Sequence, residues 1–162
     1  MSVFHPGSTR QYDVGLAFIR VITGVIFLAH GAQKLFVFGL DGVTGGFAQM
    51  GIPMAGVVAP LVALLEFVGG IALIGGFLTR PVSLALAFNM LGALLFAHVK
   101  NGFFLPGGFE FVLLLMATTV ALTLAGAGAF AIDSLIARRR GAVESLPAGA
   151  AAEARARARR VA

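Results

Sequence analysis

Long apolar stretches alternate with short polar segments along the chain. The four apolar stretches span about residues 14–38, 54–78, 81–99 and 107–130. Each comes close to the roughly 20 residues that an α-helix needs to cross a bilayer core of about 30 Å. The pattern therefore predicts an all-α membrane protein, built as a bundle of four transmembrane helices.

Composition favours a membrane protein over a soluble one. Hydrophobic residues make up 59% of the chain and charged residues 12%, and the mean hydropathy is +0.96. Soluble domains have about 45–50% apolar and about 25% charged residues. A chain of 162 residues also lacks the polar surface to cover four such stretches in water. The four stretches are therefore better explained as membrane-spanning segments than as one large soluble core.

The polar segments define the domain organisation. We expect a short N-terminal segment (1–13), a transmembrane domain (14–133) and a basic tail (134–162). The first apolar stretch is longer than the hydrophobic region of a signal peptide, so it is expected to remain as the first helix. The tail contains "AAAEARARARR". This composition favours a largely disordered tail, with contact to anionic lipid as the alternative.

The positions of lysine and arginine predict the orientation. In a four-span topology the N-terminal segment with Arg10, the turn with Arg80 and the arginine-rich tail share one side. The other side carries only Lys34 and Lys100, at helix ends. The positive-inside rule then places both termini in the cytoplasm. The net charge of +5 is explained by topology, so no nucleic-acid partner is expected.

The absence of cysteine limits the chemistry. It excludes disulfides, thiolate catalysis and cysteine-ligated iron–sulfur clusters. A redox role would therefore depend on a bound small molecule or on a partner subunit. The segment "HGAQK" offers no acidic partners at metal-ligand spacing, so no metal site is expected.

One carboxylate interrupts the second apolar stretch. In "PLVALLEFVGGIALIGGF" (60–77), Glu66 is the one ionisable residue. A charged side chain at the bilayer centre costs about 2.5–3.5 kcal/mol on the insertion scale. Residue counts from the helix ends place Arg20, Glu66 and Asn89 at similar depth and predict an Arg20–Glu66 pair. Two interpretations stay open: a fixed ion pair that joins the first two helices, and a polar site that handles protons.

Helical spacing predicts which side chains face the bundle. On the first helix a stripe recurs every three or four residues. Its members are Arg20, Thr23, Gly24, Phe27, His30, Gly31 and Lys34.

Further polar residues form a predicted outer layer, made of His30, Lys34, His98, Lys100 and Glu110. His98 lies half a turn from Asn89, so it is expected to face a neighbouring helix or loop. His30 and His98 stand at similar depth, as axial haem ligands do. Their spacing supports haem weakly, and haem is disfavoured as a cofactor.

Four motifs together resemble the DoxX family of bacterial membrane proteins. They are "RVITGVIFLAHGAQKLFVFG", "GGFAQMGIP", "LLEFVGGIALIGGFLTR" and "HVKNGFFLPGGFEFVLLL", within residues 13–133. The resemblance implies a four-helix integral protein of the plasma membrane. Family members include small subunits of a thiosulfate:quinone oxidoreductase and a membrane component linked to cytoplasmic sulfurtransferase and superoxide-detoxifying proteins; others are tied to quinone or catechol stress. The family's recurrent positions correspond here to Arg20, His30, Gly31, Lys34, Glu66, Gly69, Gly70, Arg80, His98 and Glu110.

The leading hypothesis is a membrane component of a redox system with a quinone-related site inside the bundle. A quinone needs hydrogen-bond donors for its carbonyls and a proton route. Glu66 and Glu110 are the candidates for proton handling. The candidate substrate-binding residues are Arg20, His30, Lys34, Asn89 and His98, with Phe27, Phe36 and Phe96 flanking the ring.

Two alternatives belong to other classes. The protein can be a non-catalytic anchor that recruits cytoplasmic redox proteins through Arg80, Arg138–Arg140 and the tail. It can also transport or bind a small molecule or lipid. A channel would require a homo-oligomer, because four short helices leave little lumen.

Overall fold

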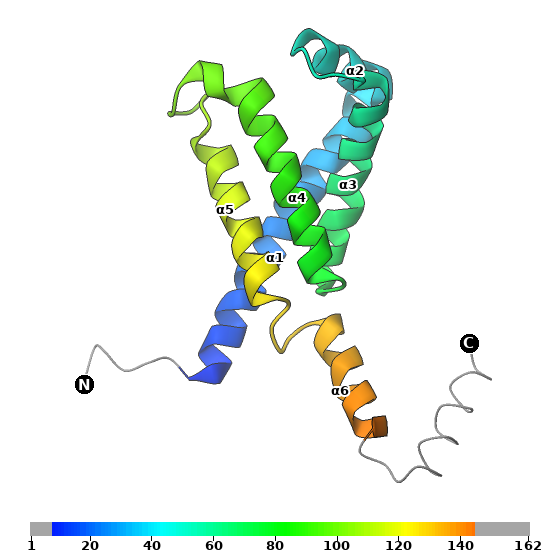
Figure 1. The fold of residues 1–162 in the computed structure, drawn as a ribbon, viewed down its shortest axis with the longest axis vertical. Helices are drawn as coiled ribbons and strands as arrows, with labels where there is room; N and C mark the ends of the chain where they lie inside the picture. Colours follow the sequence, from blue (N-terminus) through cyan, green and yellow to red (C-terminus); the bar gives the residue numbers. More distant parts are fainter. Residues whose placement is uncertain (1–7, 145–162) are drawn as a thin grey trace, which may run out of the picture.

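The computed structural model describes residues 8–144. Helices dominate this range (Figure 1). In chain order they are α1 (Thr9–Ala32), the π-helical turn η1 (Gln33–Val37), α2 (Gly39–Gln49), α3 (Ala55–Gly75), α4 (Thr79–Ala93), the π-helical turn η2 (Leu94–His98), the 3₁₀ turn η3 (Val99–Asn101), α5 (Glu110–Ala125) and α6 (Ile132–Glu144).

Three helical segments are long and apolar enough to cross a membrane. They are Thr9–Val37, Ala55–Gly75 and Thr79–Asn101, with 29, 21 and 23 residues. A fourth apolar helix, Glu110–Ala125, has 16 residues and is shorter. The all-α class and the membrane environment expected from the sequence are confirmed.

The first helix begins earlier than the hydrophobic pattern suggests. Ser8 caps it: the Ser8 hydroxyl accepts the Gln11 N–H at 3.3 Å, and the Gln11 side chain accepts the Ser8 N–H at 2.7 Å. This reciprocal capping box satisfies backbone donors that the first turn would leave unpaired. The polar residues 9–13 therefore belong to α1 although they carry no apolar periodicity.

The helices form two arms that diverge (Figure 1). One arm holds α1 and the antiparallel α3, with α2 lying across its upper end, and the other is the α4–α5 hairpin. The arms meet where α3 turns into α4. The buried core draws from all four long helices and consists of Phe27, Leu73, Leu86, Met90, Val112 and Leu115.

Glycines bring α1 and α3 into backbone contact. A Cβ atom on Gly31 would lie 2.3 Å from the Phe67 nitrogen, and one on Gly70 would lie 2.5 Å from the Leu28 nitrogen. A Cβ on Gly24 would lie 2.8 Å from the Gly70 carbonyl oxygen. Helices in lipid associate largely through close packing at small residues. Moving an apolar side chain from lipid into a helix interface gains little free energy, because both environments are apolar.

Burial on α1 follows most of the predicted stripe. Arg20, Thr23, Gly24, Phe27 and Gly31 are buried, and Lys34 is half-buried. His30 is exposed, although its ring lies 6.4 Å from that of Phe111 on α5. Large apolar side chains such as Val25, Leu61 and Phe88 cover the outer surface, which is typical of helices that face lipid rather than water.

The chain after α5 continues into α6. This helix occupies the first part of the segment that the sequence assigned to a disordered tail. Residues 145–162, with the arginines of "EARARARR", lie outside the described residues.

We expect Gly31→Ala and Gly70→Ala to destabilise the protein by about 1–3 kcal/mol each, because the added methyl group meets backbone atoms that cannot move independently. The measurement is the thermal unfolding midpoint of the purified protein in detergent. Gly92→Ala is the control, since a Cβ there meets nothing within 4 Å and alanine favours a helix. Equal midpoints for all three variants would contradict the close contact of α1 and α3.

Candidate functional site

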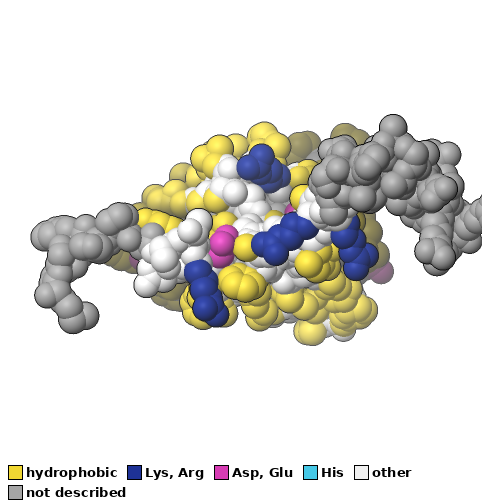
Figure 2. Space-filling view, turned by 90° about the horizontal axis from the view of Figure 1, so that it is seen from below, with side chains coloured by type: hydrophobic (Ala, Val, Ile, Leu, Met, Phe, Trp, Pro, Cys, Tyr) yellow, Lys and Arg dark blue, Asp and Glu magenta, His cyan; other side chains and the backbone are white. Residues whose placement is uncertain are grey.

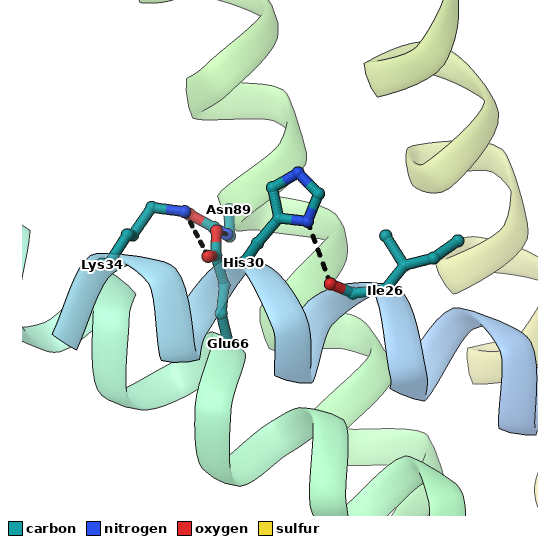
Figure 3. Close-up of polar contacts among 5 residues, drawn as sticks. All are labelled: Ile26, His30, Lys34, Glu66 and Asn89. Atoms are coloured by element: carbon teal, nitrogen blue, oxygen red, sulfur yellow. Dashed lines mark hydrogen bonds and ion pairs between the residues drawn. The ribbon is translucent and has the colours of Figure 1, made fainter. Parts of the chain in front are cut away.

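A cluster of Lys34, Glu66 and Asn89 lies between three helices (Figure 3). The Lys34 ammonium forms an ion pair and hydrogen bond with Glu66 Oε2. The Asn89 amide donates to Glu66 Oε1 at 2.8 Å. Both carboxylate oxygens are thus bonded to side chains of other helices. We call these three residues the carboxylate cluster.

The helices position this cluster through their faces. Glu66 sits near the middle of α3, on the same buried face as Ala59, Ala63, Gly70 and Leu73. Lys34 lies in the π-helical turn η1 that ends the first span, and π-turns occur often at functional sites.

Burial makes the pairing of Glu66 energetically necessary. The side chain of Glu66 is 4% exposed and that of Lys34 is 18% exposed. A buried carboxylate without a partner is strongly destabilising, and the lysine and the amide together satisfy this one.

The predicted Arg20–Glu66 pair is wrong. Arg20 is buried, and its guanidinium donates to the carbonyl oxygens of Leu73 at 3.1 Å and Phe130 at 2.6 Å. The close contacts of α1 with α3 set Arg20 against the last turn of α3, and Glu66 lies seven residues, or roughly 10 Å, before Leu73. The prediction counted residues from the expected helix ends, and such a count does not give the register between α1 and α3.

Arg20 instead caps the C-terminal end of α3. Its positive charge lies where the last carbonyls of a helix carry partial negative charge. Gly76 follows the helix with φ +68°, and a Cβ there would lie 1.8 Å from Arg20 Nη1. At the same end, Asp133 accepts the N–H groups of Leu78 and Thr79 at 2.9 Å each and so caps α4. Arg20 and Asp133 therefore have structural roles.

His30 lies beside the carboxylate cluster, on an exposed face of α1. Its Nδ1 lies 3.0 Å from the Ile26 carbonyl oxygen (Figure 3). A carbonyl can only accept, so Nδ1 carries the proton in the neutral ring and Nε2 carries the lone pair. Nε2 bonds to none of the described residues, and the imidazole packs 6.4 Å from the Phe111 ring between centroids. His30 therefore has one ring nitrogen bonded to the backbone and one without a partner among the described residues, one helical turn from Lys34.

The remaining predicted site residues do not join this cluster. His98 Nδ1 bonds to the Gly107 carbonyl at 3.1 Å, and Glu110 accepts the Leu105 N–H at 2.8 Å. Both side chains thus order the loop between η3 and α5. His98 was expected to face a neighbouring helix or loop, because it lies half a turn from Asn89. Its contact with this loop agrees with that prediction.

The aromatic surroundings differ from the prediction. Phe27 belongs to the core and Phe36 packs edge-on against Phe67, with centroids 5.7 Å apart. Phe111, which the sequence did not single out, is the ring next to His30. Within residues 8–144, no group of three or more His, Asp or Glu side chains is placed to hold a metal ion.

These features define a class: a multi-pass membrane protein that carries an ion-paired carboxylate between its spans. The chain belongs to the DoxX family, whose model matches residues 15–99. It is a protein of the bacterial inner membrane. No solved structure matches it.

Named relatives cover most of the chain. It is 32% identical over 127 residues to "Putative oxidoreductase CatD" of Bacillus subtilis, covering 78% of this chain and 90% of that protein. It is 34% identical over 139 residues to "Inner membrane protein YqjF" of Escherichia coli, covering 78% of this chain and 95% of that protein.

We expect Lys34→Met to destabilise the protein by about 3 kcal/mol, because it leaves the Glu66 carboxylate buried without its cation. The double variant Lys34→Met/Glu66→Gln removes the charge as well and should recover most of this loss. Thermal unfolding midpoints in detergent measure both effects, with Lys100→Met on the exposed surface as the control. A double variant no more stable than Lys34→Met alone would refute the pairing.

Proposed function

We propose that this protein is the membrane component of a quinone-linked redox system, and that the quinone binds beside His30 and the carboxylate cluster. The observation that carries the proposal is the placement of a bonded carboxylate, Glu66, near the middle of α3 and beside the exposed His30 of the first span. A quinone dissolved in lipid reaches such a histidine laterally, without passing through water.

The side chains match the needs of quinone chemistry. Reduction of a quinone to a quinol takes two electrons and two protons. His30 Nε2, when protonated, donates to one quinone carbonyl and transfers the first proton. The Lys34 ammonium, held by the Glu66 carboxylate, supplies the second proton and is left as a neutral amine. Phe111 offers an aromatic face to the ring.

The electrons must come from outside the chain. It contains no cysteine and therefore no cysteine-ligated cluster. A reduced partner protein or a directly bound donor supplies them in this proposal. The oxidoreductase name of the Bacillus subtilis relative is consistent with a redox role and gives no substrate.

We expect a short-chain quinone such as ubiquinone-1 to bind the purified protein saturably. His30→Leu should weaken binding about tenfold, the effect of losing one hydrogen bond to a charged group. Glu66→Gln should weaken it to a similar extent, because Lys34 loses the carboxylate that holds it. Isothermal titration measures the binding. Glu110→Gln is the matched control, since its side chain holds only the Leu105 N–H and should leave binding unchanged.

Two outcomes would reject the proposal. A folded Glu66→Gln protein that binds the quinone as tightly as the wild type would show that the carboxylate has no part in binding. A Glu66→Gln protein that fails to fold would assign the carboxylate cluster to helix pairing. Ultraviolet absorbance before and after chemical reduction then shows whether the purified protein retains a quinone.

We also propose that α5 completes a fourth span, with both chain ends in the cytoplasm. The helix Glu110–Ala125 is about 24 Å long. Phe109 before the helix and the loop residues after Ala125 extend the apolar segment at its two ends. Exposed arginines gather at the end that carries the start of α1, the α3–α4 turn and α6, as the end-on view shows (Figure 2). They are Arg10, Arg80, Arg138 and Arg139.

The absence of cysteine permits a direct test of this topology. We expect Asp41→Cys and Lys100→Cys to react with a membrane-impermeant maleimide on intact cells, and Ser8→Cys and Arg138→Cys to react only after lysis. Labelling of Arg138→Cys on intact cells, with Ser8→Cys protected, would mean that α5 does not cross.

A further inference from the structure

A groove of about 790 Å³ lies at the end of the molecule opposite the carboxylate cluster. The first turns of α1 form one wall, the start of α6 forms the other, and the segment after α5 lines the floor. Arg10 and Lys34 are 24 residues apart on the first span, or roughly 36 Å along the axis. The groove is therefore a separate feature, placed where the spans end at the membrane surface.

The lining combines apolar surface with positive charge. Phe130, Ile132 and Leu135 supply apolar side chains that are each 42–58% exposed. Arg10 on α1 and Arg138 on α6 also line the groove, and both are exposed.

The other charged residues near the groove do not cancel the positive charge of its lining. Asp13 lines the groove, but one of its oxygens accepts the Ala129 N–H at 2.9 Å and holds the floor in place. Beneath the floor, Arg20 donates to the Phe130 carbonyl at 2.6 Å, which brings a buried cation to the same segment. Asp133 at the start of α6 does not line the groove, and its carboxylate accepts the N–H groups at the start of α4.

We propose that this groove binds an anionic phospholipid of the surrounding bilayer. The phosphate lies between Arg10 and Arg138, and the upper part of an acyl chain covers Phe130, Ile132 and Leu135. Basic pockets beside transmembrane helices at the membrane surface bind anionic headgroups. A free phosphate would use the arginines and leave the apolar floor uncovered, so the groove chemistry favours a lipid. The lipid joins α1 to α6, and its effect is to hold α6 against the bundle.

The chain has no tryptophan, so Leu135→Trp introduces a single fluorescent reporter in the groove wall. The protein in neutral detergent is titrated with dihexanoyl phosphatidylglycerol, dihexanoyl phosphatidylcholine or inorganic phosphate. We expect a saturable change in emission with phosphatidylglycerol, and at least tenfold weaker effects from the other two. A higher unfolding midpoint of the wild-type protein with phosphatidylglycerol than with phosphatidylcholine tests the same binding without the reporter.

Arginine variants in the reporter background locate the site. Arg10→Gln and Arg138→Gln should each weaken phosphatidylglycerol binding about fivefold, the contribution of one basic residue at a membrane surface. Arg139→Gln is the control, because Arg139 is the exposed neighbour of Arg138 on α6 and does not line the groove. Glu66→Gln should leave lipid binding unchanged, so this proposal and the quinone proposal fail independently.

Three results would overturn the lipid site. Equal binding of both phospholipids would remove the role of the arginines. Inorganic phosphate binding as tightly as phosphatidylglycerol would make the groove a free-anion site. An equal loss in Arg139→Gln and Arg138→Gln would mean that the attraction comes from the diffuse charge of this face.

Discussion

The backbone contact between α1 and α3 is the constraint on which the other features of this protein depend. Gly24, Gly31 and Gly70 remove the side chains that would hold the two helices apart. The contact fixes which residues stand opposite one another in antiparallel register. It sets Lys34 against Glu66 and, three to four turns of α1 away, sets Arg20 against the last turn of α3. A shift of one turn, about 5.4 Å, would separate both pairs and leave two charged side chains buried without partners.

The charged side chains between the helices fall into two groups by the atoms they bond. Arg20 and Asp133 bond to backbone carbonyl or N–H groups at helix ends, and they stabilise the junction of α3, α4 and α6. Glu66 bonds to side chains alone, Lys34 and Asn89. Peptide groups are not acid–base groups, whereas the side chains of lysine and glutamate are. This difference supports a functional role for Glu66 and a structural one for Arg20.

Family membership and local geometry answer different questions. The DoxX match and the relatives establish an inner-membrane protein, and one relative carries an oxidoreductase name. Function depends on the site itself, because one fold hosts many chemistries. Here the candidate site residues come from α1, η1, α3, α4 and α5, and His30 is exposed beside Phe111.

The sequence alone determined the helical class, the membrane environment and the buried stripe of α1, because lipid requires long apolar helices and the 3.6-residue period assigns their faces. It also singled out Glu66, since one carboxylate in an apolar span needs a partner. The choice of that partner was decided by tertiary structure. Residue counts place side chains along a helix but do not give the register between helices, which here depends on glycine contacts. For the same reason only the packed structure shows His30 beside Phe111, and Arg20 at the end of α3 rather than beside Glu66.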